Sequence, residues 1–318
     1  MKKAFTLVEL IIVIGIIAVL MASLMVATSG ATDTARAAKC MANIRNLAAA
    51  SNAYAMEKGW YPLAGSRQEV TYSSGQAAYD EQVGWISWLS TGDPFGHRSG
   101  QRPSQPVKNL KVCPSGGTGN EEDATFAITN GAIWKFTGRI RDIYRCPAHE
   151  RYCREQGAQP PEFSYVMNMK FCFDTSKGQD ATASPGGRGV NYNDNSIIRS
   201  AERTLMFAEL PTKRMGTGTE DDAGGSGDEY ASDCTLHYHV TVDGKELGKE
   251  WSGKTEAIGF NHVGSKKKRY GHVAFADGHV EKITYGGGIS PEELTALLCE
   301  GIDVAFDGKQ WKKIDGQD

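Results

Sequence analysis

The sequence predicts an α+β fold, in which a long N-terminal helix packs on an antiparallel β-sheet head with long loop insertions. Three observations lead to this fold class. Residues 5–26 form an almost unbroken apolar run, residues 27–58 continue with helical periodicity, and residues 272–283 show the clearest hairpin pattern of the chain. Stretches rich in Gly, Ser, Asp and Pro separate the remaining short apolar segments, which is typical of loops between strands.

The apolar run contains one ionisable side chain, Glu9, and is preceded by Lys2 and Lys3. A bilayer core needs about 20 helical residues, so the length suits one membrane span. Flanking lysines favour the cytoplasmic side, so we expect a cytoplasmic N-terminus and a periplasmic or extracellular head. A carboxylate inside such a helix is costly, which indicates a function for Glu9. Two alternatives give Glu9 no role: an uncleaved signal anchor, and a signal peptide cleaved near residues 22–24.

Residues 27–58 predict an amphipathic continuation of the same helix. Apolar or small residues recur on one helical face at spacings of three and four: Met41, Ile44, Leu47, Ala48, Ser51, Tyr54 and Ala55. Gly59 stands where a glycine commonly ends a helix. We therefore expect the globular head to occupy residues 59–318.

The hairpin pattern at residues 272–283 consists of two alternating runs joined by Asp277-Gly278. Asp-Gly is favoured in two-residue type I′ turns, which predicts that Phe275 faces Val280 across the hairpin. Further on, Ser290 precedes a proline and an apolar periodic stretch. This pattern predicts a short helix with Ser290 as its N-cap.

The chain has 318 residues, a net charge of −3 and seven cysteines. A head outside the cytoplasm favours disulfides, and the odd number leaves at least one cysteine over. Cys146 and Cys153 are close enough in sequence for a local loop and are the first candidates for a pair, while Cys40 is the candidate left over. No nucleic-acid partner is expected, because the basic run at residues 266–269 is interpreted as a solvated loop.

Residues 4–9, Ala-Phe-Thr-Leu-Val-Glu, resemble the processing site of type IV prepilins and type II secretion pseudopilins. The resemblance implies a leader of residues 1–4, cleavage between Ala4 and Phe5 by a prepilin peptidase, and N-methylation of Phe5. It also implies that Glu9 pairs with the N-terminal amine of a neighbouring subunit during assembly. The family most often has Gly where this chain has Ala4, and because both residues are small we expect processing to be retained.

This resemblance implies a pilin-like fold and a structural protein rather than an enzyme. We expect a minor subunit of a type IV pilus-like or type II secretion pseudopilus fibre, held in the inner membrane by a single span before assembly. Its expected partners are the prepilin peptidase, other pilin or pseudopilin subunits and the inner-membrane assembly platform. The alternative is a membrane-anchored binding or hydrolytic domain outside the cytoplasm that uses the leader for export.

A second resemblance lies near the C-terminus. His262 and the segment Asp277-Gly278-His279 resemble the signature of large prepilin-like proteins named for a His-x9-Asp-Gly pattern. Fourteen residues separate His262 from Asp277 here, which departs from the family's spacing. Imidazole and carboxylate suit zinc or similar ions, so His262, Asp277 and His279 are candidate metal ligands. Histidines in alternating strands also need no metal, and both interpretations stay open.

Two other stretches offer metal ligands. Cys146 and Cys153 flank a histidine and resemble half of a zinc site, although an oxidising compartment favours a disulfide. Asp221, Asp222 and Asp228 lie in an acidic, glycine-rich stretch with the oxygen ligands that calcium prefers. Acidic loops of this kind are commonly only solvated. The sequence thus predicts no required cofactor, with calcium as the candidate ion.

Overall fold

The computed structural model describes residues 7–64, 67–73, 76–82, 84–86, 128–129, 131–155, 163–174, 179–180, 200–211, 235–236, 238–248, 257–264 and 268–314. Its α-helices are α1 (Leu7–Lys58), α3 (Pro147–Glu155) and α5 (Pro291–Glu300), and its 3-10 helices are η1 (Trp134–Thr137), η2 (Arg141–Tyr144) and η3 (Met169–Cys172). Its strands are β1 (Arg67–Ser73), β2 (Gln76–Gln82), β3 (Tyr165–Asn168), β4 (Phe173–Asp174), β5 (Gln179–Asp180), β6 (Leu205–Glu209), β7 (Thr235–Leu236), β8 (His239–Val242), β9 (Lys245–Gly248), β10 (His262–Val263), β11 (Arg269–Phe275), β12 (Val280–Thr284), β13 (Val304–Phe306) and β14 (Trp311–Lys313).

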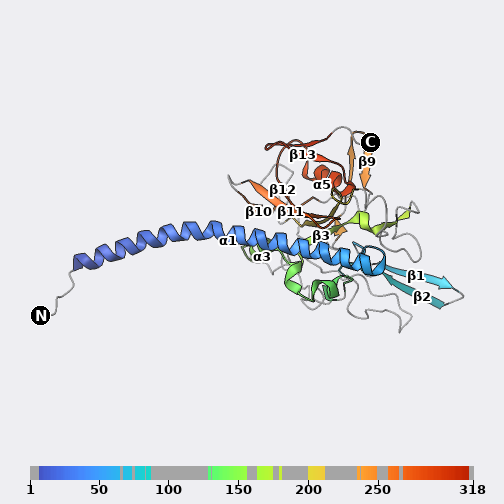
Figure 1. Cartoon of the computed structure of the whole chain (residues 1–318), viewed down its shortest axis with the longest axis horizontal. Helices are drawn as coiled ribbons and strands as arrows, with labels where there is room; N and C mark the ends of the chain where they lie inside the picture. The colour runs from blue at the N-terminus through green and yellow to red at the C-terminus, as the bar shows by residue number, and fades with distance from the viewer. Residues whose placement is uncertain are drawn as a thin grey trace.

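The fold mixes helices with a mainly antiparallel sheet, so it belongs to the α+β class (Figure 1). The largest sheet has the strand order β10-β11-β6-β3-β7, and β12 pairs with β11. All of these pairs are antiparallel except β3–β7. Four two-stranded sheets, β1–β2, β4–β5, β8–β9 and β13–β14, complete the described strand pairs.

Helix α1 runs along one side of the head, and its N-terminal half extends beyond the head (Figure 1). In its second half Ile44, Leu47 and Ala55 are fully buried, whereas the side chains of residues 45–46 are exposed. This alternation follows the helical period, because one face packs on the sheet and the other faces solvent. The helix ends at Lys58, and Gly59 takes a left-handed φ of +83° while donating its N–H to the Ala55 carbonyl at 2.7 Å.

The central strand β6 is covered on both faces, since it contacts both α1 and α5. All five of its residues are buried, as expected for a strand without a solvent-facing side. On the α1 side, Phe207 packs edge-to-face on Trp85 with ring centroids 5.0 Å apart, and Trp85 stacks on Tyr144. The period of two along a strand places Glu209 on the same face as Phe207. A carboxylate therefore points into the interface between the sheet and α1.

The C-terminal hairpin forms, but its register differs from the expected one. Ala274 pairs with Val280, and the Phe275 N–H donates to the His279 carbonyl at 3.0 Å. The predicted pairing of Phe275 with Val280 is therefore wrong by one residue. The reason is the turn: Gly278 has a φ of +91°, whereas the described non-glycine residues with positive φ do not include Asp277. A three-residue loop with glycine in the left-handed position replaces the two-residue type I′ turn.

The helix predicted from Ser290 is confirmed as α5. The Ser290 Oγ accepts a hydrogen bond from the Glu293 N–H at 3.1 Å, and Pro291 opens the helix. Gly301 closes it with a φ of +74°. In the described part of the chain, no helix combines the length and apolarity required to cross a membrane.

Candidate functional site

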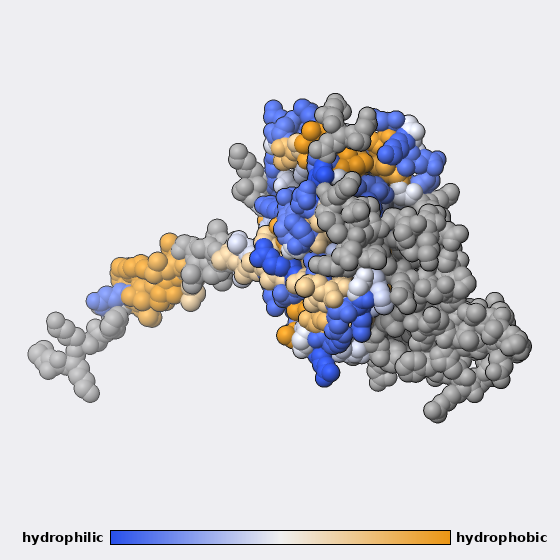
Figure 2. Space-filling model, turned by 45° about the vertical axis from the view of Figure 1, so that its right-hand side comes forward, coloured by the Kyte–Doolittle hydropathy of each residue, from blue (hydrophilic) through white to orange (hydrophobic). Residues whose placement is uncertain are grey.

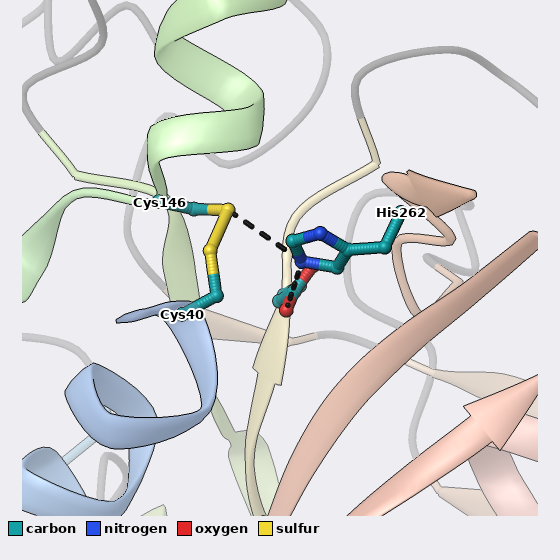
Figure 3. Close-up of side chains that lie close together, drawn as sticks. Cys40, Cys146 and His262 are labelled. Atoms are coloured by element: carbon teal, nitrogen blue, oxygen red, sulfur yellow. Dashed lines mark hydrogen bonds and ion pairs between the residues drawn. A yellow bond between two sulfur atoms is a disulfide. The ribbon is translucent and has the colours of Figure 1, made fainter. Parts of the chain in front are cut away.

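A cluster of buried polar and sulfur-containing side chains lies between α1 and the sheet. Cys40 comes from α1, Cys146 precedes α3, Glu209 ends β6 and His262 begins β10. One ligand-type atom of each residue lies within 4.8 Å of those of the other three, and all four residues are buried. Figure 3 shows Cys40 and Cys146 joined by a disulfide, with the imidazole of His262 directed at the Cys146 sulfur. Segments far apart in the sequence thus converge on one buried point.

The disulfide corrects two expectations. Cys146 pairs with Cys40, with their Cα atoms 5.1 Å apart, so the predicted Cys146–Cys153 pair is wrong and Cys40 is not left over. Helix α3 supplies the reason, because the seven residues from Cys146 to Cys153 rise about 10 Å along a helix, beyond the reach of a disulfide. Cys153 is itself disulfide-bonded, but not to Cys146. Among the described cysteines, buried Cys299 is free.

Glu209 is the centre of the hydrogen-bond network in this cluster. Its Oε1 accepts from His272 Nδ1 at 2.7 Å and contacts His262 Nε2 at 3.0 Å. The His272 backbone N–H lies 3.3 Å from the same oxygen, and the Asn261 amide donates to Oε2 at 3.3 Å. Both carboxylate oxygens are therefore occupied, which a buried carboxylate requires to stay charged.

The two histidines keep Glu209 ionised despite its burial. Burial by itself raises the pKa of a carboxylate, but the attraction and hydrogen bonds of His262 and His272 outweigh it and lower the pKa of Glu209 to about 2. Tyr270 packs against both imidazoles, with centroid distances of 5.3 Å to His262 and 5.4 Å to His272. The imidazole rings are thus fixed by packing as well as by hydrogen bonds.

Two further buried groups border the cluster. Tyr165 pairs with Glu209 in the sheet and donates its hydroxyl to the Cys40 carbonyl at 3.4 Å. Burial, reinforced by the negative charge of Glu209, raises the pKa of Tyr165 well above its ordinary value. His149 on α3 shares a hydrogen bond of 3.1 Å with Ser164, and burial lowers the pKa of His149 to about 4, although Glu209 opposes this shift. Both side chains are therefore neutral at pH 7.

The structure separates the three residues predicted as metal ligands near the C-terminus. His262 belongs to the buried cluster, which contains neither Asp277 nor His279. These two side chains pair with each other in the β11–β12 turn, where His279 Nδ1 and Asp277 Oδ1 are 2.6 Å apart. The calcium candidates Asp221, Asp222 and Asp228 lie outside the described residues, so they stay a prediction.

The N-terminal half of α1 presents a different surface. Large apolar side chains are exposed from Leu7, at 72% of its full area, to Met21, at 58%. Figure 2 shows this apolar surface on the part of the helix that projects from the head. Glu9 lies in the first helical turn and is exposed. Ala4 and Phe5 lie outside the described residues.

Comparison with known proteins identifies this segment. A family model described as the prokaryotic N-terminal methylation motif matches residues 1–25. The chain carries a prepilin-type N-terminal segment. No curated protein and no solved structure matches the chain. A prepilin-type segment implies processing by a peptidase and assembly into pilin-like fibres in general.

One feature of the sequence, the position of Glu209, points to the buried cluster. Glu209 ends the apolar run Leu-Met-Phe-Ala, which reads as a fully buried strand. A carboxylate closing such a strand needs a partner, by the same reasoning that singled out Glu9. The partners Cys40, His262 and His272 could not be found this way, because only the tertiary fold brings them to Glu209.

Proposed function

We propose that the chain is a structural subunit of a pilus-like or pseudopilus fibre, delivered to the membrane as a prepilin. Prepilin peptidase cleaves between Ala4 and Phe5, and the new amino terminus on Phe5 is methylated. The observation that carries the proposal is the methylation motif at residues 1–25, continuing into the exposed apolar half of α1. The enlarged head suits a minor subunit, because a bulky head crowds a helical fibre.

The exposed apolar surface of residues 7–21 supports assembly by helix packing. These side chains are too numerous and contiguous to stay in water, so they need lipid or neighbouring helices around them. In a lipid bilayer the helix satisfies its own backbone hydrogen bonds, and in a fibre the same face packs on other subunits. The membrane therefore holds the subunit until assembly replaces lipid with protein.

Glu9 gives this packing its register. Once lipid or protein surrounds the helix, its carboxylate needs a positive partner. Cleavage behind Ala4 creates an α-amine on Phe5, four residues before Glu9. When neighbouring helices pack with an axial offset, the Phe5 amine of one subunit lies beside the Glu9 carboxylate of the next and neutralises its charge. Processing and assembly are thereby linked, since the uncleaved chain lacks that amine.

In such a fibre the helices form the core and the heads form the surface, so each head must be rigidly attached to its own helix. The Cys40–Cys146 disulfide joins α1 covalently to the segment before α3. Asn43, one helical turn further, donates to the Arg145 carbonyl at 2.7 Å and to the Asp142 carbonyl at 3.3 Å. The head is therefore fixed on the second half of α1, and the first half stays free for assembly.

The test is replacement of Glu9 in cells that contain the assembly machinery. Glu9→Gln removes the charge at nearly constant volume, and we expect the variant to be inserted and cleaved but absent from the sheared fibre fraction. Glu57→Gln is the matched control, because Glu57 is an exposed carboxylate at the other end of the same helix. Normal incorporation of Glu9→Gln would contradict the assembly role and favour a membrane-anchored binding or hydrolytic domain.

A further inference from the structure

One ligand-type atom of each of the four clustered side chains lies within 4.8 Å of those of the other three, which is close to the spacing of a tetrahedral metal site. Zinc–ligand bonds of about 2.0–2.3 Å place ligand atoms about 3.3–3.8 Å apart in a tetrahedron. The Cys146 Sγ lies 3.8 Å from His262 Nε2, and the same nitrogen lies 3.0 Å from Glu209 Oε1. His262 Nε2 thus faces a sulfur and a carboxylate oxygen together, which is the convergence that a bound ion requires.

The surroundings of the cluster are those of a supported metal site. Metal-binding carboxylates and imidazoles are generally held by outer hydrogen bonds that fix their orientation. Here His272 Nδ1 holds Oε1 of Glu209 at 2.7 Å, and the Asn261 amide holds Oε2 at 3.3 Å. His262 and Glu209 expose at most 2% of their side chains, so water does not compete for the site.

We propose that Cys40, Cys146, His262 and Glu209 bind one zinc-class divalent cation when the Cys40–Cys146 disulfide is reduced. Two thiolates and one imidazole select a borderline-soft ion such as zinc over calcium or magnesium, which take oxygen ligands. The same residues then join α1 to the head in either redox state, by a disulfide when oxidised and by a metal ion when reduced.

The exchange between the two states balances with a dithiol as the reductant. A dithiol transfers two electrons and two protons to the disulfide, which gives two cysteine thiols and the oxidised, cyclic dithiol. Zinc binding then releases the two thiol protons, because the ligands are thiolates. In the reverse direction a disulfide oxidant accepts the two electrons, the Cys40–Cys146 bond forms again, and the ion leaves.

The test uses the full chain in detergent micelles. The protein is reduced with dithiothreitol, transferred to reductant-free buffer without oxygen, and titrated with Co²⁺ as a spectroscopic substitute for zinc. We expect about one ion per chain, with the intense visible and cobalt–thiolate absorption of a tetrahedral site. The oxidised protein should show neither the absorption nor stoichiometric binding. Equal binding by both redox forms would overturn the proposal.

Two variants assign the ligands. Cys40→Ser/Cys146→Ser keeps the other five cysteines of the chain, so any cobalt–thiolate absorption that persists in it belongs elsewhere and overturns the proposal. His262→Gln retains both cysteines, and a cooperative unfolding transition of its oxidised form shows that it has folded. We expect reduced His262→Gln to bind zinc more than about 10-fold more weakly.

His279→Gln is the matched control for His262→Gln, because the side chain of His279 is partly exposed, at 37%, and pairs with Asp277 outside the cluster. It should bind like the natural protein. If the double cysteine variant does not fold, His262→Gln alone decides the outcome. An unchanged affinity in that variant excludes the proposed ligand set.

Discussion

Cys40 and Cys146 are joined by a disulfide across 106 residues of sequence, which connects the middle of α1 to the segment before α3. Both cysteines are fully buried, and the carboxylate of Glu209 and the imidazole of His262 lie against them. This point is where the projecting helix becomes part of the head. The stability of the junction therefore depends on a covalent bond and on a buried charge.

Removal of the disulfide should destabilise the head strongly. A disulfide that closes a loop of about this length restricts the unfolded chain, and its loss costs about 2–5 kcal/mol. We expect Cys40→Ser to lower the free energy of unfolding by this amount, measured by denaturant titration in detergent with tryptophan fluorescence. A reductant should destabilise the natural protein more than Cys40→Ser, since the variant has already lost this bond. Equal sensitivity of the two proteins would show that the bond adds nothing.

Glu209→Gln should be costly because it leaves two buried histidines without their carboxylate. Loss of one partner of a buried, hydrogen-bonded charge costs about 2–4 kcal/mol in the free energy of unfolding. The matched control is Glu246→Gln, since Glu246 also faces a histidine but its side chain is 76% exposed. We expect the control to change stability by less than about 0.5 kcal/mol. Similar losses in the two variants, measured by the same titration, would argue against the buried network.

His149 should make the head sensitive to mild acid. The unfolded chain binds a proton on His149 below the ordinary pKa of 6.5, whereas the folded chain binds it only below about 4. The folded state therefore excludes that proton, and stability falls as the pH drops from 6.5 to 4, by about 3 kcal/mol.

His149→Gln removes this titration and keeps an amide that can reach Ser164. The loss of stability between pH 7 and pH 4.5 should then be smaller in the variant than in the natural protein, whatever their difference at pH 7. Unfolding titrations at the two pH values measure both losses. Parallel losses would mean that His149 is already protonated in the folded state or exposed to water.

Gly271 is expected to tolerate no side chain, because a Cβ there would overlap the carbonyl oxygen of Gly259. Forcing atoms into such a packed contact costs about 1–3 kcal/mol, which is the expected loss for Gly271→Ala. Gly287 also lies in the C-terminal part, but a Cβ added there would meet no atom within 4 Å, so Gly287→Ala should stay within about 0.5 kcal/mol. Thermal unfolding compares the two variants directly.

The two Asp-Gly turns show how far local sequence determines a hairpin. In β8–β9, Asp243 and Gly244 have φ values of +52° and +79°, and Val242 pairs with Lys245, as a two-residue type I′ turn requires. The same dipeptide at residues 277–278 forms a longer loop, in which Asp277 Oδ1 accepts the His279 N–H at 3.0 Å. The existence of the second hairpin was predictable, but its register depends on this side-chain contact and on packing against β6.

The end of α1, the capping of α5 and the buried face of α1 follow from local rules, because each depends on residues within one or two helical turns. Local rules do not predict the disulfide partner of Cys146 or the side chains that surround Glu209. They come from segments up to 222 residues apart, from Cys40 to His262, and only the packing of α1 on the sheet brings them together. Sequence spacing therefore favoured the nearby Cys153, which the rise of α3 places out of reach.

The mass of the mature N-terminus tests the central claim most directly. The chain is purified from membranes of cells that contain prepilin peptidase, digested, and its N-terminal peptide is measured by mass spectrometry. The prepilin assignment predicts a peptide that begins at Phe5 and carries one methyl group on its amine. A chain that begins at Met1, or near residue 22, would contradict it.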